Sequence, residues 1–203
     1  MQLFWERIPK RIKELNLSDY WGSLSKNEIN SLAIYGRKYL SCNIYKDLNF
    51  GYTRFQALSG LIEMFDTMKE YQACMKTIEY LNMYNISTDD VISKHFFYNT
   101  VVDLFYKPRT PEICDFALAK QYCYEDIELV NKNKSKIRNL GDGVEFPRLP
   151  AFKILCLILE KEKRYKEAVS ICDLAIKYNL NDGTKGGFTA RRDKLLKKLE
   201  KQP

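Results

Sequence analysis

The sequence is poor in the residues that break helices and in those that build metal sites. It has nine glycines and six prolines in 203 residues, fewer than turn-rich all-β folds need. Its single histidine, His95, excludes most multi-histidine metal centres formed within one chain. No stretch approaches the ~18 apolar residues of a transmembrane helix, and no signal peptide opens the chain. These absences favour a helical, cytoplasmic protein with no membrane segment.

The composition supports a packed core that needs neither disulfides nor metal. Hydrophobic residues make up 45% of the chain and aromatic residues 13%, which excludes a disordered protein. The six cysteines stand singly and none forms Cys-x-x-Cys, so neither a zinc site nor a thioredoxin-type site is indicated. We therefore expect reduced cysteines that pack as small core residues, and we expect no cofactor.

Capping signals and apolar periodicity predict a series of paired helices. Residues 25–28 read as a capping box that opens a helix running to about residue 43. Residues 53–83 carry two apolar stripes separated by a short turn, which is typical of a helical hairpin. Residues 87–90 cap the next helix, and Thr110-Pro111 are expected to open the one after it, which reaches about residue 130.

The remaining chain contains one irregular stretch and one further hairpin. Residues 131–150 include two prolines and a glycine-containing run, so we expect a long surface loop there. We predict an all-α fold with a single helical domain over residues 1–203. Its parts are N-terminal helices in 1–48, two helical hairpins in 49–130, the loop in 131–150, and a C-terminal hairpin with a basic capping helix in 151–203.

Two of the predicted hairpins match when they are aligned on each other. On their first helices the same offsets hold large or small apolar residues: Phe152, Leu155, Cys156 and Leu159 in one, and Leu58, Leu61, Ile62 and Phe65 in the other. An aromatic residue opens each second helix, and a small residue follows three positions later: Tyr165 with Ala168, and Tyr71 with Cys74. A small side chain at that point lets the two helices pack closely.

This pattern resembles the tetratricopeptide repeat, a helical hairpin of about 34 residues. Residues 149–181 resemble the family best, and residues 55–88 form a weaker copy. In the better copy, Cys156 and Leu180 stand where the family has a glycine and a closing proline. The resemblance implies hairpins stacked as a right-handed array with a capping C-terminal helix. An irregular helical-hairpin domain that meets the same packing demand is the alternative.

Tetratricopeptide-like arrays bind partners in a concave groove lined by the first helix of each hairpin. The resemblance therefore implies a non-catalytic scaffold that binds another protein or a peptide. The side chains expected to face the groove are polar and mixed in charge: Ser59, Glu63, Asn99, Asp103, Lys107, Lys153 and Glu160. A solvated helix face is the alternative for each of them. An uncapped array end would also allow a homo-oligomer.

The net charge of +7 is concentrated in three segments. Residues 1–13 carry four Lys/Arg against one acid, residues 131–140 carry four against none, and residues 182–203 carry seven against three. Clustering of this kind suggests a surface for an anionic partner. Plain solvation of helix ends and loops is the alternative.

The C-terminal segment therefore supports a second hypothesis, the binding of nucleic acid or a phosphorylated ligand. Its candidate anion-binding residues surround the start of a predicted helix: Lys185, Arg191, Arg192 and Lys194. A helix N-terminus favours negative charge. The segment is not a phosphate-binding P-loop, because Lys185 is followed by glycine rather than Ser or Thr. A capping helix with a solvated polar face is the alternative.

No set of residues points to catalysis. Nothing near His95 in the sequence marks it as the base of a triad. Glu125 and Asp126 are predicted to lie on a polar helix face, where adjacent side chains diverge by about 100°. Cys123 has one nearby lysine, which these two acids offset. We therefore expect no enzymatic activity and no metal site.

Overall fold

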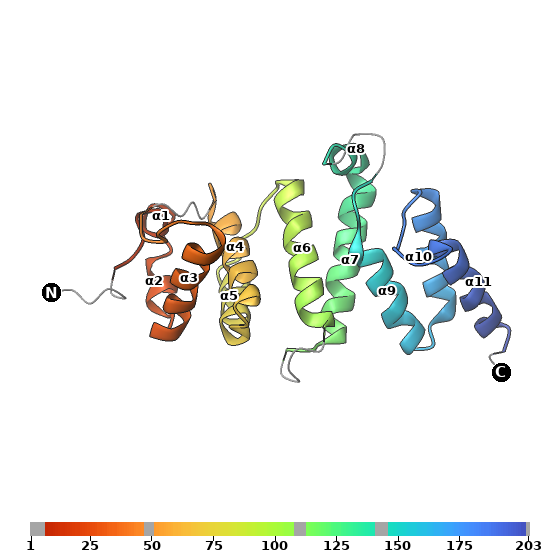
Figure 1. Ribbon diagram of the computed structural model, residues 1–203. Helices are drawn as coiled ribbons and strands as arrows, with labels where there is room; N and C mark the ends of the chain where they lie inside the picture. The colour runs from red at the N-terminus through yellow and green to blue at the C-terminus, as the bar shows by residue number, and fades with distance from the viewer. Residues whose placement is uncertain (1–6, 47–50, 108–112, 141–145, 202–203) are drawn as a thin grey trace. The chain divides into compact units, whose positions relative to one another are not determined.

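The computed structural model describes residues 7–46, 51–107, 113–140 and 146–201 (Figure 1). Over these residues the chain forms eleven helices and no strand, which confirms the all-α prediction. Contacts within the chain group into two compact units, residues 1–88 and 89–203, where the sequence predicted one domain. None of the described helices is both long and apolar enough to cross a membrane.

The described residues of the first unit, 1–88, form five helices. They are α1 (Lys10–Glu14), α2 (Ser18–Gly22), α3 (Lys26–Tyr39), α4 (Arg54–Thr67) and α5 (Tyr71–Met83). Helix α4 packs on α5, and α3 packs on α4. The predicted capping box is confirmed, because the Glu28 N–H donates to Ser25 Oγ and the Ser25 N–H donates to Glu28 Oε2. Helix α3 therefore begins where the sequence predicts, but it ends at Tyr39 rather than near residue 43.

Polar contacts tie α5 to the N-terminal helices within this unit. Lys76 Nζ lies 3.0 Å from Glu28 Oε2, and the Tyr20 hydroxyl lies 2.6 Å from Thr77 Oγ1 in the interior. Burial alone would raise the pKa of Glu28, but hydrogen bonds from the Ser25 backbone and from Lys76 outweigh it and lower that pKa. Glu28 is therefore a charged group that the folded unit stabilises.

Where the structure describes the second unit, residues 89–203, the chain forms six helices that pack largely in chain order. They are α6 (Val91–Tyr106), α7 (Phe116–Lys132), α8 (Lys134–Arg138), α9 (Pro150–Lys161), α10 (Tyr165–Lys177) and α11 (Gly187–Leu199). Helix α6 packs on α7, α7 on α9, α9 on α10, and α10 on α11 (Figure 1). Helix α6 also contacts α9. The first helices of two successive hairpins are thereby brought together.

Helix α7 does not begin where the sequence predicts. Asp115 is its N-cap, and its carboxylate accepts hydrogen bonds from the N–H groups of Ala117 and Leu118. The predicted start at Thr110-Pro111 lies outside the described residues, but Cys114 already precedes the helix. An aspartate at this position satisfies two free N–H groups of the first turn, which makes it the stronger start signal.

The segment 131–150 is not a loop throughout. Helix α8 occupies residues 134–138 and contacts α6 and α7. Its Ile137 is fully buried, and burial of this one apolar side chain explains why a lysine-rich stretch is held as a helical turn.

Hairpins α4–α5 and α9–α10 share the same turn geometry. The second residue after each first helix is left-handed, with φ of 63° at Lys69 and 60° at Lys163. In each turn the next N–H bonds to the carbonyl five residues back, at 2.8 and 2.9 Å: Glu70 to Phe65 and Arg164 to Leu159. This is the left-handed helix cap that reverses the chain tightly.

The same correspondence holds at the far ends of these hairpins. Asn85 and Asn179 have φ of 49° and 55°, and the residue after each bonds back to the carbonyl five positions earlier. The small residues Cys74 and Ala168 are both fully buried between their helices, as predicted. Two hairpins therefore repeat in detail. The stacking of all hairpins into a right-handed array stays a prediction.

Candidate functional site

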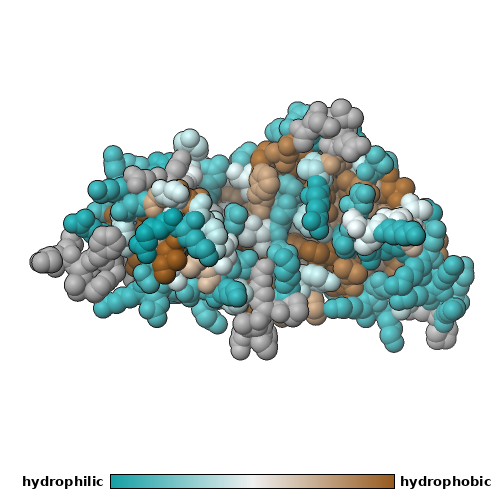
Figure 2. All heavy atoms as spheres, viewed as in Figure 1, coloured by the Kyte–Doolittle hydropathy of each residue, from teal (hydrophilic) through white to brown (hydrophobic). Residues whose placement is uncertain are grey.

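A groove between α6 and α9 in the second unit combines apolar and charged side chains. One hollow of about 360 Å³ is lined by apolar side chains that include Tyr106, Leu149, Ile154 and Leu157, and by charged ones that include Asp103, Lys107, Arg148 and Lys153. Hydrophobic side chains reach the surface over α7 and α9, whereas hydrophilic ones cover α11 (Figure 2). The hollow thus offers a partner both apolar area and charge.

A second hollow of about 490 Å³ continues the first. The two share Arg148, Leu149, Lys153, Asn181 and Asp182, and the second extends along residues 146–147 and 179–183. Together they form one channel from α6 past the start of α9 to the α10–α11 turn. This channel is termed the α6–α9 groove below.

Helical spacing explains why these side chains meet. On α9 the lining residues are three and four positions apart: Pro150, Lys153, Ile154 and Leu157. On α6 they are Asp103, Tyr106 and Lys107, with Lys107 as the C-cap. Residues at such spacing share one helix face. The contact between α6 and α9 then turns these two faces into one lining.

The carboxylates beside the groove are already paired. Asp103 Oδ2 lies 2.5 Å from Lys107 Nζ, one turn along α6. Asp182 Oδ2 lies 2.7 Å from Arg191 Nη2, and its other oxygen accepts from Thr184. Burial alone would raise the pKa of Asp182, but the hydrogen bonds from Thr184 and Arg191 outweigh it and lower that pKa. Both acids are therefore neutralised by neighbours.

Three of the predicted groove residues come together in the α6–α9 groove, namely Asp103, Lys107 and Lys153. Two others on the same helices do not line it. Asn99 turns toward His95 and lies 3.1 Å from its Nε2. Glu160 holds Lys194 and Lys198 of α11, at 3.3 and 2.6 Å. Those two side chains therefore make contacts within the fold, and their assignment to a partner-binding surface stays a prediction.

The last two predicted groove residues, Ser59 and Glu63, lie on α4 in the other unit. The Ser59 hydroxyl donates to the Phe55 carbonyl at 2.8 Å, and Glu63 is exposed. Their assignment to a partner-binding surface stays a prediction.

The cations proposed for anion binding are largely engaged within the chain. Arg191 pairs with Asp182, Arg192 with Asp173 and Asp193, and Lys194 with Glu160. A hollow of about 450 Å³ lies at the start of α11, lined by Gly186, Gly187 and other uncharged residues. Lys185 is exposed but does not belong to that lining. Anion binding here stays a prediction, with little unpaired charge to support it.

His95 has a partner that sequence reasoning missed. Its Nδ1 lies 2.6 Å from Asp126 Oδ1, and the two side chains are 2% and 0% exposed. The prediction that Asp126 lies on a polar helix face is wrong, because α7 turns it toward α6. The signal was present: Asp126 is three residues after buried Cys123 and four before buried Val130, within the apolar stripe.

This buried pair lies in the interior of the second unit. Burial raises the pKa of Asp126 and also that of the Cys123 thiol one turn earlier, so the thiol stays protonated. Neither His95 nor Asp126 lines any of the hollows described here. Within the described parts of the chain, no three His, Cys, Asp or Glu side chains are grouped to hold a metal ion.

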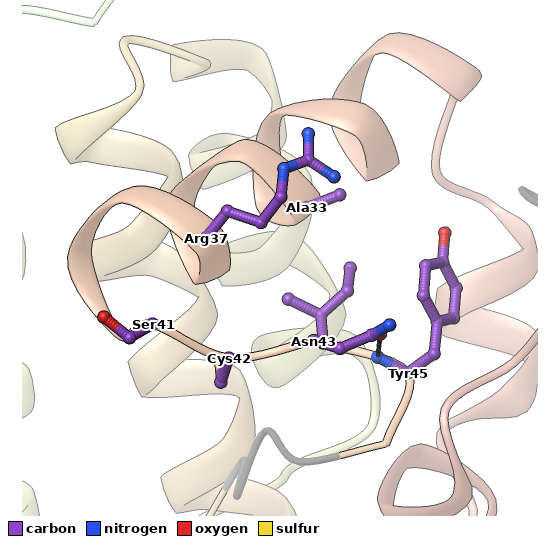
Figure 3. A pocket seen from close by; sticks show the side chains of 7 residues that line it. Ala33, Arg37, Ser41, Cys42, Asn43 and Tyr45 are labelled. Carbon is purple, nitrogen blue, oxygen red and sulfur yellow. Dashed lines mark hydrogen bonds between the residues drawn. The ribbon is translucent and has the colours of Figure 1, made fainter.

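A separate hollow of about 380 Å³ lies in the first unit, between α3 and the segment that follows it. Arg37 of α3 lines it together with Asn43 and Tyr45 of the following segment (Figure 3). The segment packs closely because Gly36 has no side chain: a Cβ there would meet Ile44 Cγ2 at 2.6 Å. The lining holds one cation and no carboxylate.

Comparisons of the chain with protein-family models, with curated proteins and with solved structures find no match.

Proposed function

We propose that this chain is a non-catalytic interaction module, and that its α6–α9 groove binds an extended segment of a partner protein. The carrying observation is that Asp103, Lys107 and Lys153, from the first helices of two successive hairpins, line one hollow together with apolar side chains. An apolar lining with a few polar groups at its edge is the usual form of a peptide-binding site.

The repeated hairpin supports this proposal. Hairpins α4–α5 and α9–α10 share their turns and their buried small residues, in keeping with the resemblance to tetratricopeptide repeats. Hairpin repeats expose the faces of their first helices as a continuous surface. The α6–α9 groove lies on such faces, which makes it the expected place for a partner.

Site-specific photocrosslinking tests the proposal. A photoreactive amino acid at Leu157, in the groove, should yield a discrete crosslinked partner in cells that normally produce the chain. The matched control carries it at Ser170, which is exposed on α10 and outside the groove lining. Mass spectrometry of the adduct identifies the partner segment. Adducts of equal yield at both positions, or none at Leu157, would contradict the assignment.

A further inference from the structure

We propose that the segment bound in the α6–α9 groove is acidic, with aspartate or glutamate side chains flanking an aliphatic one. This inference rests on the proposed function and adds the chemistry of the partner. It follows from which charges along the groove remain unpaired after the intramolecular ion pairs have formed.

Two cations of the groove lining have no carboxylate partner among the described residues. Arg148 is exposed and Lys153 is half-buried. Lys153 Nζ is aimed across the groove and donates to the Asp182 backbone carbonyl at 2.9 Å. The Asp103 and Asp182 carboxylates are held by Lys107 and Arg191. Arg191 reaches Asp182 from outside the lining, so with Arg191 counted, four cations stand against two carboxylates, an excess of two positive charges.

The start of α9 adds positive potential at the same place. This helix of 12 residues begins at Pro150, has no side-chain cap at Leu149, and carries no acid in its first turn. Uncapped N–H groups leave a partial positive charge at a helix N-terminus. Arg148 precedes this terminus by two residues and Lys153 lies within its first turn. A carboxylate bound between them would meet three sources of positive potential.

The apolar lining specifies the rest of the partner. Tyr106, Leu149, Ile154 and Leu157 lie beside the two cations. They give an aliphatic side chain a surface to bury, which a nucleic-acid backbone would not use. A basic segment would be repelled by Arg148 and Lys153. An acidic segment with a leucine-like side chain satisfies both parts of the groove.

Selection from a random peptide library tests this inference on the full chain. Phage-displayed 12-residue peptides are panned against the protein, and enriched sequences are synthesised and measured by fluorescence anisotropy. We expect the enriched peptides to carry at least two Asp or Glu residues around a Leu or Ile. We expect R148E/K153E to weaken their binding by at least about tenfold, since each cation contributes a charge-assisted contact.

Two further variants keep the result interpretable. R148M/K153M removes the charges while keeping aliphatic stems, and it should lose binding with an unchanged circular dichroism spectrum. K166E/K177E makes the same charge change at exposed sites on α10, and it should bind like the unaltered protein.

The outcomes separate the inference from the function on which it rests. Enriched peptides that are basic or neutral, and whose binding L157D abolishes, would overturn the acidic inference but not the assignment of the groove as a peptide-binding site. If L157D weakens the binding of none of the enriched peptides, both the acidic inference and the peptide groove are overturned. A single-stranded oligonucleotide that binds, loses affinity in R148E/K153E and displaces the peptides would also overturn the inference, in favour of a nucleic-acid site.

Discussion

Removal of His95 should expose how much the second unit depends on its buried polar pair. In His95→Leu, Asp126 loses the neighbour whose Nδ1 lies 2.6 Å from Oδ1. Its other oxygen, Oδ2, is buried and has no hydrogen-bond partner in the described structure. The variant therefore leaves a carboxylate with no partner in a site that is 0% exposed.

The expected cost follows from the burial of that group. Loss of one partner of a buried pair typically destabilises by about 3–5 kcal/mol, because the remaining charge is uncompensated. For a unit of about 100 residues this lowers Tm by roughly 10 °C or more. Burial already raises the pKa of Asp126, and in the variant that pKa should rise further. Because the folded form then holds its proton more tightly than the unfolded chain, the deficit should shrink as pH falls from 7 toward 5.

Thermal and urea unfolding, followed by circular dichroism at 222 nm at pH 7 and pH 5, measure these effects. The double variant His95→Leu/Asp126→Leu removes both polar groups and should recover most of the lost stability. Glu128→Ala is the matched control on α7, because its partner Lys132 is 70% exposed. It should leave the unfolding midpoint unchanged. A His95→Leu midpoint as high as that of Glu128→Ala, or a deficit that grows at pH 5, would refute the reasoning.

Two further predictions concern the rest of the fold. The pKa of Glu28 is lowered in the folded state. The stability that the Glu28 carboxylate contributes is therefore present above its unfolded pKa of about 4.3 and is lost as pH falls through the lower folded pKa. Acid titration of the unfolding midpoint should show a steeper decline below pH 5 in the unaltered protein than in Lys76→Met. Ala168 is fully buried where α9 and α10 meet, so Ala168→Leu should lower the free energy of unfolding in urea by about 1–3 kcal/mol. Ser170 is exposed on the same helix, so Ser170→Leu should leave that free energy unchanged. Equal unfolding midpoints for the two variants would contradict close packing at residue 168.

Local signals predicted much of the secondary structure. The capping box at Ser25, the cap at Asp90 and the small residue Ala168 all act as expected, because each depends on neighbours within a few residues. The predicted start of α7 was wrong because two local cap signals lie close together in the sequence. The Thr-Pro pair indicated the earlier start, whereas Asp115 is the N-cap in the structure. Helix α8 was missed because burial of Ile137 is a tertiary effect.

The candidate site was predictable only in part. Lys153 and Asp103 were expected to face a groove, and they line one, since helical spacing alone places them on exposed faces of first helices. Arg148 was not foreseen, because it lies in the irregular segment before α9 and no periodicity marks it. Asn99 was expected beside them but turns inward to His95.

The sequence by itself determined that this chain is helical, where most hairpins turn and which small residues lie between their helices. Those features depend on contacts between residues close in the chain. The tertiary structure decided which charges remain for a partner. His95 meets Asp126 across 31 residues, and Glu160 meets Lys198 across 38. Because such pairs form only when distant helices pack, only the fold shows that Arg191 is neutralised while Arg148 and Lys153 are left at the groove.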